Sequence, residues 1–119
     1  METAECWLPD AFGCPASLPQ IISQTGFRVF VRQKLSWSEA DAYPHHSFWW
    51  EGIDATRVLA HFPPSDTCNG DFSVKQPRFD AKNFADHDRS TFSIYPFGHG
   101  DGGGGPIEEM LERAARAGD

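Results

Sequence analysis

The chain has 119 residues and a formal net charge of −7, with 39% hydrophobic and 13% aromatic residues. This length suits one small domain, and the acidic charge argues against non-specific binding to nucleic acid. No segment reaches the ~20 consecutive apolar residues of a membrane span, and no signal peptide is visible, so we expect no membrane association. The three cysteines, Cys6, Cys14 and Cys68, lack disulfide or zinc spacing and favour a cytoplasmic protein.

The first third of the chain predicts a strand, a helix and a second strand. Residues 3–8 predict a short strand, because Pro9 has no backbone donor and would sit badly inside a sheet. Apolar residues at helical spacing, with Gly26 as a stop, predict a helix over 15–25. Aromatic and β-branched residues predict a strand over 27–31. The default for such a unit is a right-handed parallel crossover.

The rest of the chain predicts a looser alternation of strands and helices. In chain order we expect an irregular segment over 32–56 with one helical turn at 38–42, a strand over 57–62, a weak helix over 79–89, a strand over 91–97 and a helix over 107–117. This order indicates an α/β fold with a parallel sheet of about four strands. A closed barrel of the common kind needs roughly eight strand–helix units, so the chain is expected to be part of a larger barrel or sheet.

Two aspartates are candidates for catalysis. Asp10 follows the first expected strand, and Asp101 lies in the glycine loop 98–105 after the last one. In a parallel α/β fold both would lie at the carboxyl edge of the sheet, and glycoside cleavage needs two carboxyl groups. The alternative for each is an ordinary turn residue. The glycine loop lacks the spacing of a phosphate-binding motif, so phosphate binding is disfavoured.

Residues 43–54 combine aromatic, histidine and carboxylate side chains. Paired tryptophans with carboxylates and imidazoles are typical of a sugar-binding surface, where rings stack on the sugar and polar groups bind its hydroxyls. Two alternatives stay open. In one, the aromatic residues form ordinary core, and in the other, His45, His46 and His61 bind a metal.

Seven motifs, in order and spacing, resemble the catalytic domain of the class II α-mannosidases, glycoside hydrolase family 38. They lie at residues 7–13, 18–21, 33–37, 44–54, 56–58, 61–64 and 100–106. The resemblance runs through essentially the whole chain and is greatest to the cytosolic and bacterial branch.

The resemblance implies a retaining, zinc-dependent α-mannosidase acting on terminal α-D-mannosides, with a (β/α)7-type barrel of which residues 1–119 are an incomplete segment. It places Asp10 on the catalytic nucleophile, which is also a zinc ligand, and Asp101 on the acid/base. The residues that would line the sugar subsite are Trp7, Phe12, His45, His46, Trp49, Trp50, Glu51 and Asp54.

Some features of the family are absent. The early His-x-Asp zinc motif and the later histidine ligand have no counterpart, so only one of four expected zinc ligands is present. The chain is therefore read as a fragment of a catalytic domain, and we expect it alone neither to retain zinc tightly nor to hydrolyse α-mannosides. The alternative hypothesis is an inactive remnant that at most binds carbohydrate through its aromatic residues.

Overall fold

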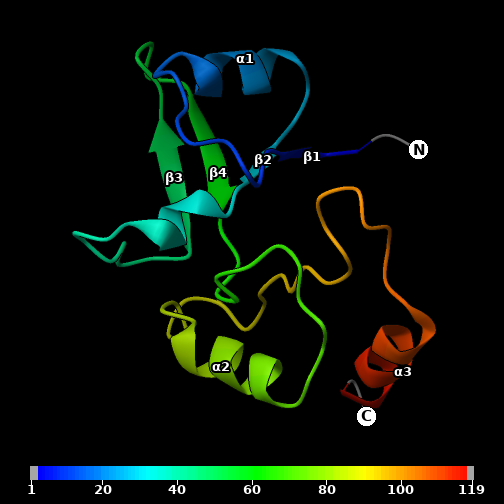
Figure 1. Cartoon of the computed structure of the whole chain (residues 1–119). Helices are drawn as coiled ribbons and strands as arrows, with labels where there is room; N and C mark the ends of the chain where they lie inside the picture. The colour runs from blue at the N-terminus through cyan, green and yellow to red at the C-terminus, as the bar shows by residue number, and fades with distance from the viewer. Residues whose placement is uncertain (1–2, 118–119) are drawn as a thin grey trace. The chain divides into compact units, whose positions relative to one another are not determined.

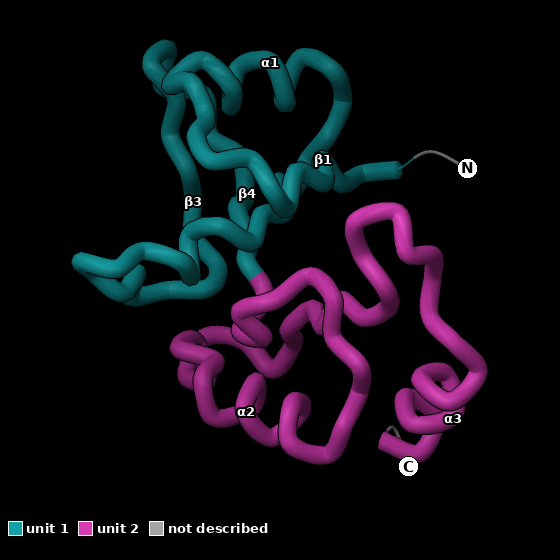
Figure 2. Tube along the Cα trace, in the orientation of Figure 1, with its two compact units in different colours: residues 1–62 teal, residues 63–119 magenta. Residues whose placement is uncertain are grey.

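The structure is a computed structural model that describes residues 3–117. The chain divides into two compact units, residues 1–62 and residues 63–119 (Figure 2). None of the described helices is long and apolar enough to cross a membrane.

A four-stranded sheet forms the framework of the first unit (Figure 1). Its strands are β1 (Glu5–Trp7), β2 (Val29–Val31), β3 (Ser47–Glu51) and β4 (Arg57–His61). They lie in the order β1-β2-β4-β3, in which β1, β2 and β4 are parallel and β3 is antiparallel to β4. The sheet is therefore mixed and open, which confirms an α/β fold but corrects the expectation of a wholly parallel sheet. A segment of a (β/α)7 barrel is not confirmed.

Helix α1 (Leu18–Gln24) connects β1 to β2 and packs on β4. The predicted strand–helix–strand unit is thus confirmed, with its two strands parallel. Ile22 of the helix joins Phe30, Val58 and Ala60 of the sheet in a core whose members are at most 3% exposed. Phe30 also packs on Trp50, with ring centroids 5.3 Å apart. This burial of aromatic and branched side chains holds the short strands together.

Strand β3 lies within the segment expected to be irregular over 32–56. It forms a hairpin with β4, closed by a turn in which the Gly52 N–H donates to Thr56 O at 2.8 Å. Gly52 also lies close under the start of α1, where a β-carbon would come within 3.0 Å of Ala16 O and 3.1 Å of Pro19. A glycine is therefore needed at this point. The short helical turn is a 3₁₀ helix at Lys34–Trp37, earlier than the predicted 38–42.

The described part of the second unit contains two helices, α2 (Lys75–Asn83) and α3 (Glu108–Ala117). Helix α3 matches its prediction, and α2 begins and ends earlier than the predicted 79–89. The predicted strand over 91–97 is wrong: between residues 63 and 117 the only β-pairing is an isolated bridge from Gly70 to Phe97. Strands need a hydrogen-bonding neighbour, and no strand of this unit supplies one within the described residues.

Candidate functional site

Asp10 lies in a turn directly after β1, at the carboxyl edge of the parallel strands. The Leu8 N–H donates to Val31 O at 3.0 Å, which continues the pairing of β1 with β2 beyond the strand itself. The Gln33 N–H then donates to Pro9 O at 3.2 Å and ties the turn to the chain after β2. The predicted location of Asp10 at a strand end is confirmed.

The Asp10 carboxylate pairs with Lys34. This lysine is the first residue of the 3₁₀ helix that follows the neighbouring strand β2. Lys34 Nζ lies 2.5 Å from Asp10 Oδ1. The ammonium also lies 3.2 Å from the ring centroid of Trp37 and 4.8 Å from that of Phe12. The lysine side chain is only 9% exposed, whereas that of Asp10 is 67% exposed. The cation is thus fixed by two rings, and it holds a carboxylate that faces solvent.

Arg32 holds the loop that follows Asp10. Its Nη1 donates to Cys14 Sγ at 2.7 Å and its Nη2 to Ala11 O at 2.6 Å. The Arg32 N–H also donates to His61 O at 3.0 Å, which extends the pairing of β2 with β4. The arginine therefore links the loop to the sheet edge. The motif at residues 33–37 contributed to the family resemblance, but no role was predicted from the sequence for Arg32 or Lys34. Both follow β2, so the carboxyl-edge rule for parallel strands was the signal that could have found them.

A cavity of about 290 Å³ lies in the same unit and is bordered by Cys14, Arg32 and His61. Its remaining lining is mostly aromatic and includes Tyr43, Phe48 and Trp50. His61 Nδ1 lies 2.9 Å from Ser47 Oγ. The cavity thus combines ring faces with a guanidinium and an imidazole, groups that bind sugars as well as small anions.

The predicted sugar-contacting residues fall in different places. Trp49 and Trp50 point to opposite faces of β3, so the 66% exposed Trp49 is separated from the cavity that Trp50 lines. His46 is buried against Phe62, with ring centroids 4.6 Å apart. Trp7 is half-exposed in β1, and Phe12 is largely exposed beside Lys34. His45 precedes β3 and is partly buried.

Glu51 and Asp54 are not brought near Asp10. Because β3 is antiparallel to β4, the hairpin turn lies at the opposite edge of the sheet from Asp10. Glu51 Oε2 there accepts from Arg57 Nε at 2.7 Å. Asp54 accepts from the Thr56 N–H at 3.0 Å and from its hydroxyl at 2.7 Å, and these bonds lower the pKa of the Asp54 carboxyl. Both residues stabilise the hairpin.

Asp101 belongs to the second unit and is exposed in the glycine loop. Asp101 does not follow a strand, so the reason for expecting it at the carboxyl edge of the sheet no longer applies. Its φ of 52° lies in the left-handed region, which aspartate tolerates better than most residues. The Gly103 N–H donates to Gly100 O at 2.8 Å and closes the turn around it.

The described residues do not form a zinc site. Zinc in proteins takes three or four ligands from histidine, cysteine, aspartate and glutamate, and residues 3–117 contain no group of three such side chains placed to hold a metal. Asp10, the predicted ligand, is engaged by Lys34. The same absence of a three-ligand group among the described residues gives no support to the alternative in which His45, His46 and His61 bind a metal.

A further carboxyl group, Asp80 of α2, is buried with only 8% exposure. Burial, together with the negative charge of Asp66, raises the pKa of Asp80 to about 6. Because this pKa lies above the unfolded value of 3.8, the folded state loses stability as the pH rises through about 6. Ionised Asp80 is therefore an internal source of instability at neutral pH.

The variant Asp80→Asn is expected to be more stable than the original chain by about 2 kcal/mol at pH 8, because it removes the buried charge. The gain should shrink as the pH falls towards 4, where Asp80 is protonated in the folded state. Urea unfolding followed through NMR resonances of α2 at both pH values measures this. Exposed Asp88→Asn is the matched control. An equal gain in stability from both variants would show that the change in net charge, and not the burial of Asp80, is responsible.

Comparisons with known proteins show the family to which the chain belongs. The family model described as "Glycosyl hydrolases family 38 N-terminal domain" matches residues 1–119. Human "Alpha-mannosidase 2C1" is 49% identical over 113 residues, which cover 95% of this chain and 11% of that protein. "Alpha-mannosidase G" of Dictyostelium discoideum is 49% identical over 109 residues, which cover 92% of this chain and 10% of that protein.

"Alpha-mannosidase" of Saccharomyces cerevisiae is more distant, at 39% identity over 110 residues, which cover 92% of this chain and 10% of that protein. The chain thus spans about a tenth of the length of the curated relatives it matches. The family model covers the whole chain, and the resemblance inferred from the seven motifs is confirmed. The chain belongs to the glycosyl hydrolase family 38 N-terminal domain family.

Proposed function

We propose that this chain is part of a retaining α-mannosidase catalytic domain that hydrolyses terminal α-D-mannosides in a full-length enzyme. The family and the names of its relatives support a hydrolase of this class. The observation that carries the proposal is the solvent-facing Asp10 carboxylate at the carboxyl edge of the parallel strands. It is held there by Lys34, whose ammonium packs over the Trp37 ring.

In this proposal Asp10 is the nucleophile. Its carboxylate attacks the anomeric carbon, and the bond from that carbon to the leaving oxygen breaks. Lys34 engages Oδ1, so we assign the attack to Oδ2. The fixed position of the Lys34 ammonium orients the Asp10 carboxylate for this attack.

Asp101 is proposed as the acid/base. It would protonate the leaving oxygen in the first step and then take a proton from the water that releases the sugar. A retaining enzyme holds its two carboxyl groups about 5–5.5 Å apart. The proposal therefore requires this separation between Asp10 and Asp101 in the full-length enzyme. Zinc is proposed only for the full-length enzyme, with its other ligands drawn from segments beyond these residues.

Carbohydrate binding without hydrolysis is the second candidate. It is favoured by the aromatic cavity of about 290 Å³ lined by Trp50, Tyr43 and Phe48. Such a cavity suits stacking on a sugar ring whether or not bond cleavage follows. For either function we propose a cytoplasmic location, since the three cysteines are all free thiols, as a reducing compartment favours.

An exchange of segments tests the proposed function. The matching region of the Dictyostelium relative is replaced by this chain, and hydrolysis of an aryl α-mannoside is followed by proton NMR. We expect turnover that releases the α-anomer first, as retention requires. Release of the β-anomer first would contradict the retaining mechanism. A folded chimera that binds mannose without turnover, beside an active parent, would instead support the binding candidate.

A further inference from the structure

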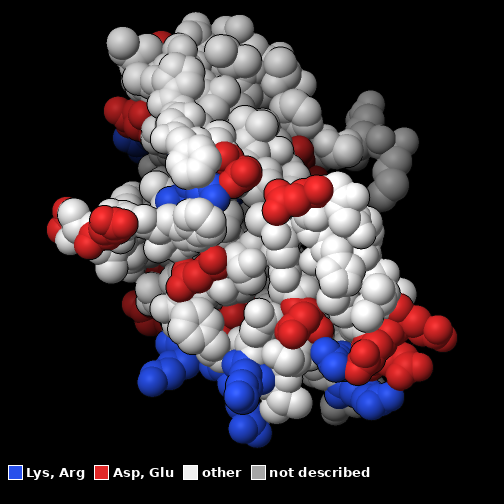
Figure 3. All heavy atoms as spheres, in the orientation of Figure 1, with Lys and Arg blue, Asp and Glu red and all other residues white. Residues whose placement is uncertain are grey.

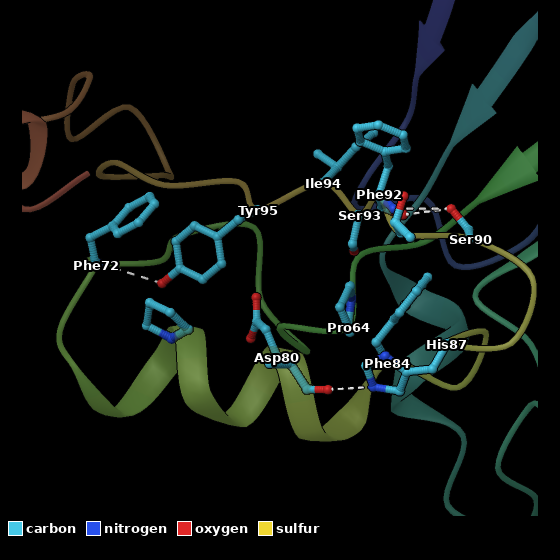
Figure 4. A pocket seen from close by; sticks show the side chains of 13 residues that line it. Pro64, Phe72, Asp80, Phe84, His87, Ser90, Phe92, Ser93, Ile94 and Tyr95 are labelled. Atoms are coloured by element: carbon cyan, nitrogen blue, oxygen red, sulfur yellow. Dashed lines mark hydrogen bonds between the residues drawn. The ribbon is translucent and has the colours of Figure 1, made fainter. Parts of the chain in front are cut away.

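A second cavity, of about 300 Å³, lies wholly within the second unit (Figure 4). It lies between α2 and the segment 90–95, away from every residue given a role above except Asp80. Its walls are mainly aromatic and apolar, with Phe72, Phe84, Phe92, Tyr95 and Pro64 among them. This volume and lining are typical of sites for small organic ligands.

The aromatic wall at one end is held in place by several contacts. The Tyr95 hydroxyl donates to the side-chain oxygen of Gln76 and accepts from the Phe72 N–H at 3.4 Å. The ring of Phe72 packs against those of Tyr95 and Phe97, with centroids 4.5 and 4.9 Å away. Since the tyrosine hydroxyl is engaged in this way, the ring face is what the wall offers to a ligand.

Asp80 points from α2 into this cavity (Figure 4). Its side chain is more than nine-tenths buried, yet neither carboxylate oxygen has a hydrogen-bond partner among the described residues. No lysine or arginine is among the described residues that line the cavity. A buried carboxylate without a donor or a cation is costly, so the site lacks the partner that its chemistry calls for.

The surroundings define that partner. An anion would be repelled by Asp80. A metal ion would need further ligands, and the described residues offer no group of three ligand side chains. An organic cation meets both needs at once, because its N–H groups donate to the carboxylate while its hydrocarbon body packs on the rings.

We propose that this cavity binds a small organic ammonium ion, with Asp80 as the counter-ion and the surrounding rings as its apolar contact. This site is independent of the proposed hydrolysis of mannosides. A bound cation would satisfy the carboxylate that otherwise weakens the fold, so the ligand would also stabilise the second unit.

The proposal predicts a pH dependence with a definite sign. The pKa of Asp80 is raised to about 6, so the carboxylate that attracts the cation forms as the pH rises through that value. The other titratable groups that face it are Asp66, Tyr95 and His87. Of these groups, His87 has its Nε2 atom 2.6 Å from Ala81 O. Affinity for a cation should therefore rise from pH 5 to pH 8.

The test compares cyclohexylammonium with cyclohexanol, a neutral molecule of nearly the same shape, by NMR titration of the 119-residue chain at pH 7.5. We expect the ammonium to shift resonances of the cavity residues and to bind about tenfold or more tighter than the alcohol. Asp80→Asn should remove this preference, and it should fold because it eliminates a buried charge. Asp88→Asn, an exposed carboxylate on the same unit, is the matched control and should bind as the original chain does.

Three results would overturn the proposal. Equal affinity for the ammonium and the alcohol would show an apolar cavity with no role for charge. Unchanged preference for the ammonium in Asp80→Asn would place the cation elsewhere. Absence of cavity shifts with the ammonium at any soluble concentration, in a chain whose spectrum shows a folded second unit, would show that the cavity does not bind it.

Discussion

Replacing Asp10 by asparagine in an active enzyme that carries this segment is expected to lower kcat by about 10⁴-fold or more, as removal of a catalytic nucleophile does elsewhere. Asparagine keeps the shape of the side chain and can still accept from Lys34. It cannot form the covalent intermediate of a retaining mechanism. The initial rate of aryl α-mannoside hydrolysis in the segment-exchange enzyme measures the loss.

Lys34→Met is the comparison for this variant. It keeps the carboxylate and leaves an apolar chain between the rings of Phe12 and Trp37. We expect it to lose far less activity, about tenfold, because the ion pair orients Asp10 but does not react, and Asp10 is largely exposed. Activity of Asp10→Asn at or above that of Lys34→Met would rule out a nucleophilic role for Asp10.

Replacing Asp101 by asparagine is expected to lower kcat by about 10²–10⁴-fold for mannosides with poor leaving groups, the usual contribution of a general acid. Asparagine is the suitable replacement, because Asp101 has a φ of 52° and asparagine tolerates this left-handed conformation. Alanine would add backbone strain to the loss of the proton donor. Rates for a series of aryl mannosides measure the effect.

The leaving-group series contains its own control. A dinitrophenolate leaves without protonation, so formation of the intermediate from a dinitrophenyl mannoside should be nearly unchanged in Asp101→Asn. A loss of the same size for every leaving group would mean that Asp101 supports the loop or the fold rather than donating a proton. The neighbouring exposed Glu108→Gln, at the start of α3, should leave the whole series unchanged.

The elements with strong local signals were predicted well. The strand–helix–strand unit of β1, α1 and β2 was found because Pro9 follows the end of β1 and Gly26 follows the end of α1. Apolar residues keep a regular helical period between these two positions. Helix α3 was found for the same reason, with Pro106 before it and acidic residues in its first turn.

The two errors in strand assignment, at residues 47–51 and 91–97, have a common cause, because strands are stabilised by neighbours that a local pattern does not show. Residues 47–51 form β3 since the hairpin pairs them with β4, although the local pattern predicted an irregular segment over 32–56. Residues 91–97 alternate like a strand, but they have no strand to pair with in the described part of the second unit, and Pro96 lacks a donor.

The candidate site was predicted only in part, because side-chain pairing depends on the order of strands. Asp10 could be placed at a strand end from the chain alone. The carboxyl-edge rule could also have placed Lys34 at this edge, but its ion pair with Asp10 depends on β1 and β2 being adjacent in the sheet. The reversed direction of β3 likewise decides that Glu51 and Asp54 stay at the far edge.

The surface charges fit the composition. In the view of Figure 3, basic side chains lie in separate groups divided by acidic and uncharged ones. This pattern is consistent with the net charge of −7. The expectation that the chain does not bind nucleic acid stays a prediction.

Covalent labelling tests the central claim most directly. The segment-exchange enzyme is treated with a fluorinated mannosyl fluoride, which forms the glycosyl–enzyme intermediate faster than water releases it, and the labelled peptide is identified by mass spectrometry. The proposed mechanism predicts a mannosyl ester on Asp10, lost in Asp10→Asn and kept in Lys34→Met. A label on another carboxylate, or labelling that persists in Asp10→Asn, would contradict it.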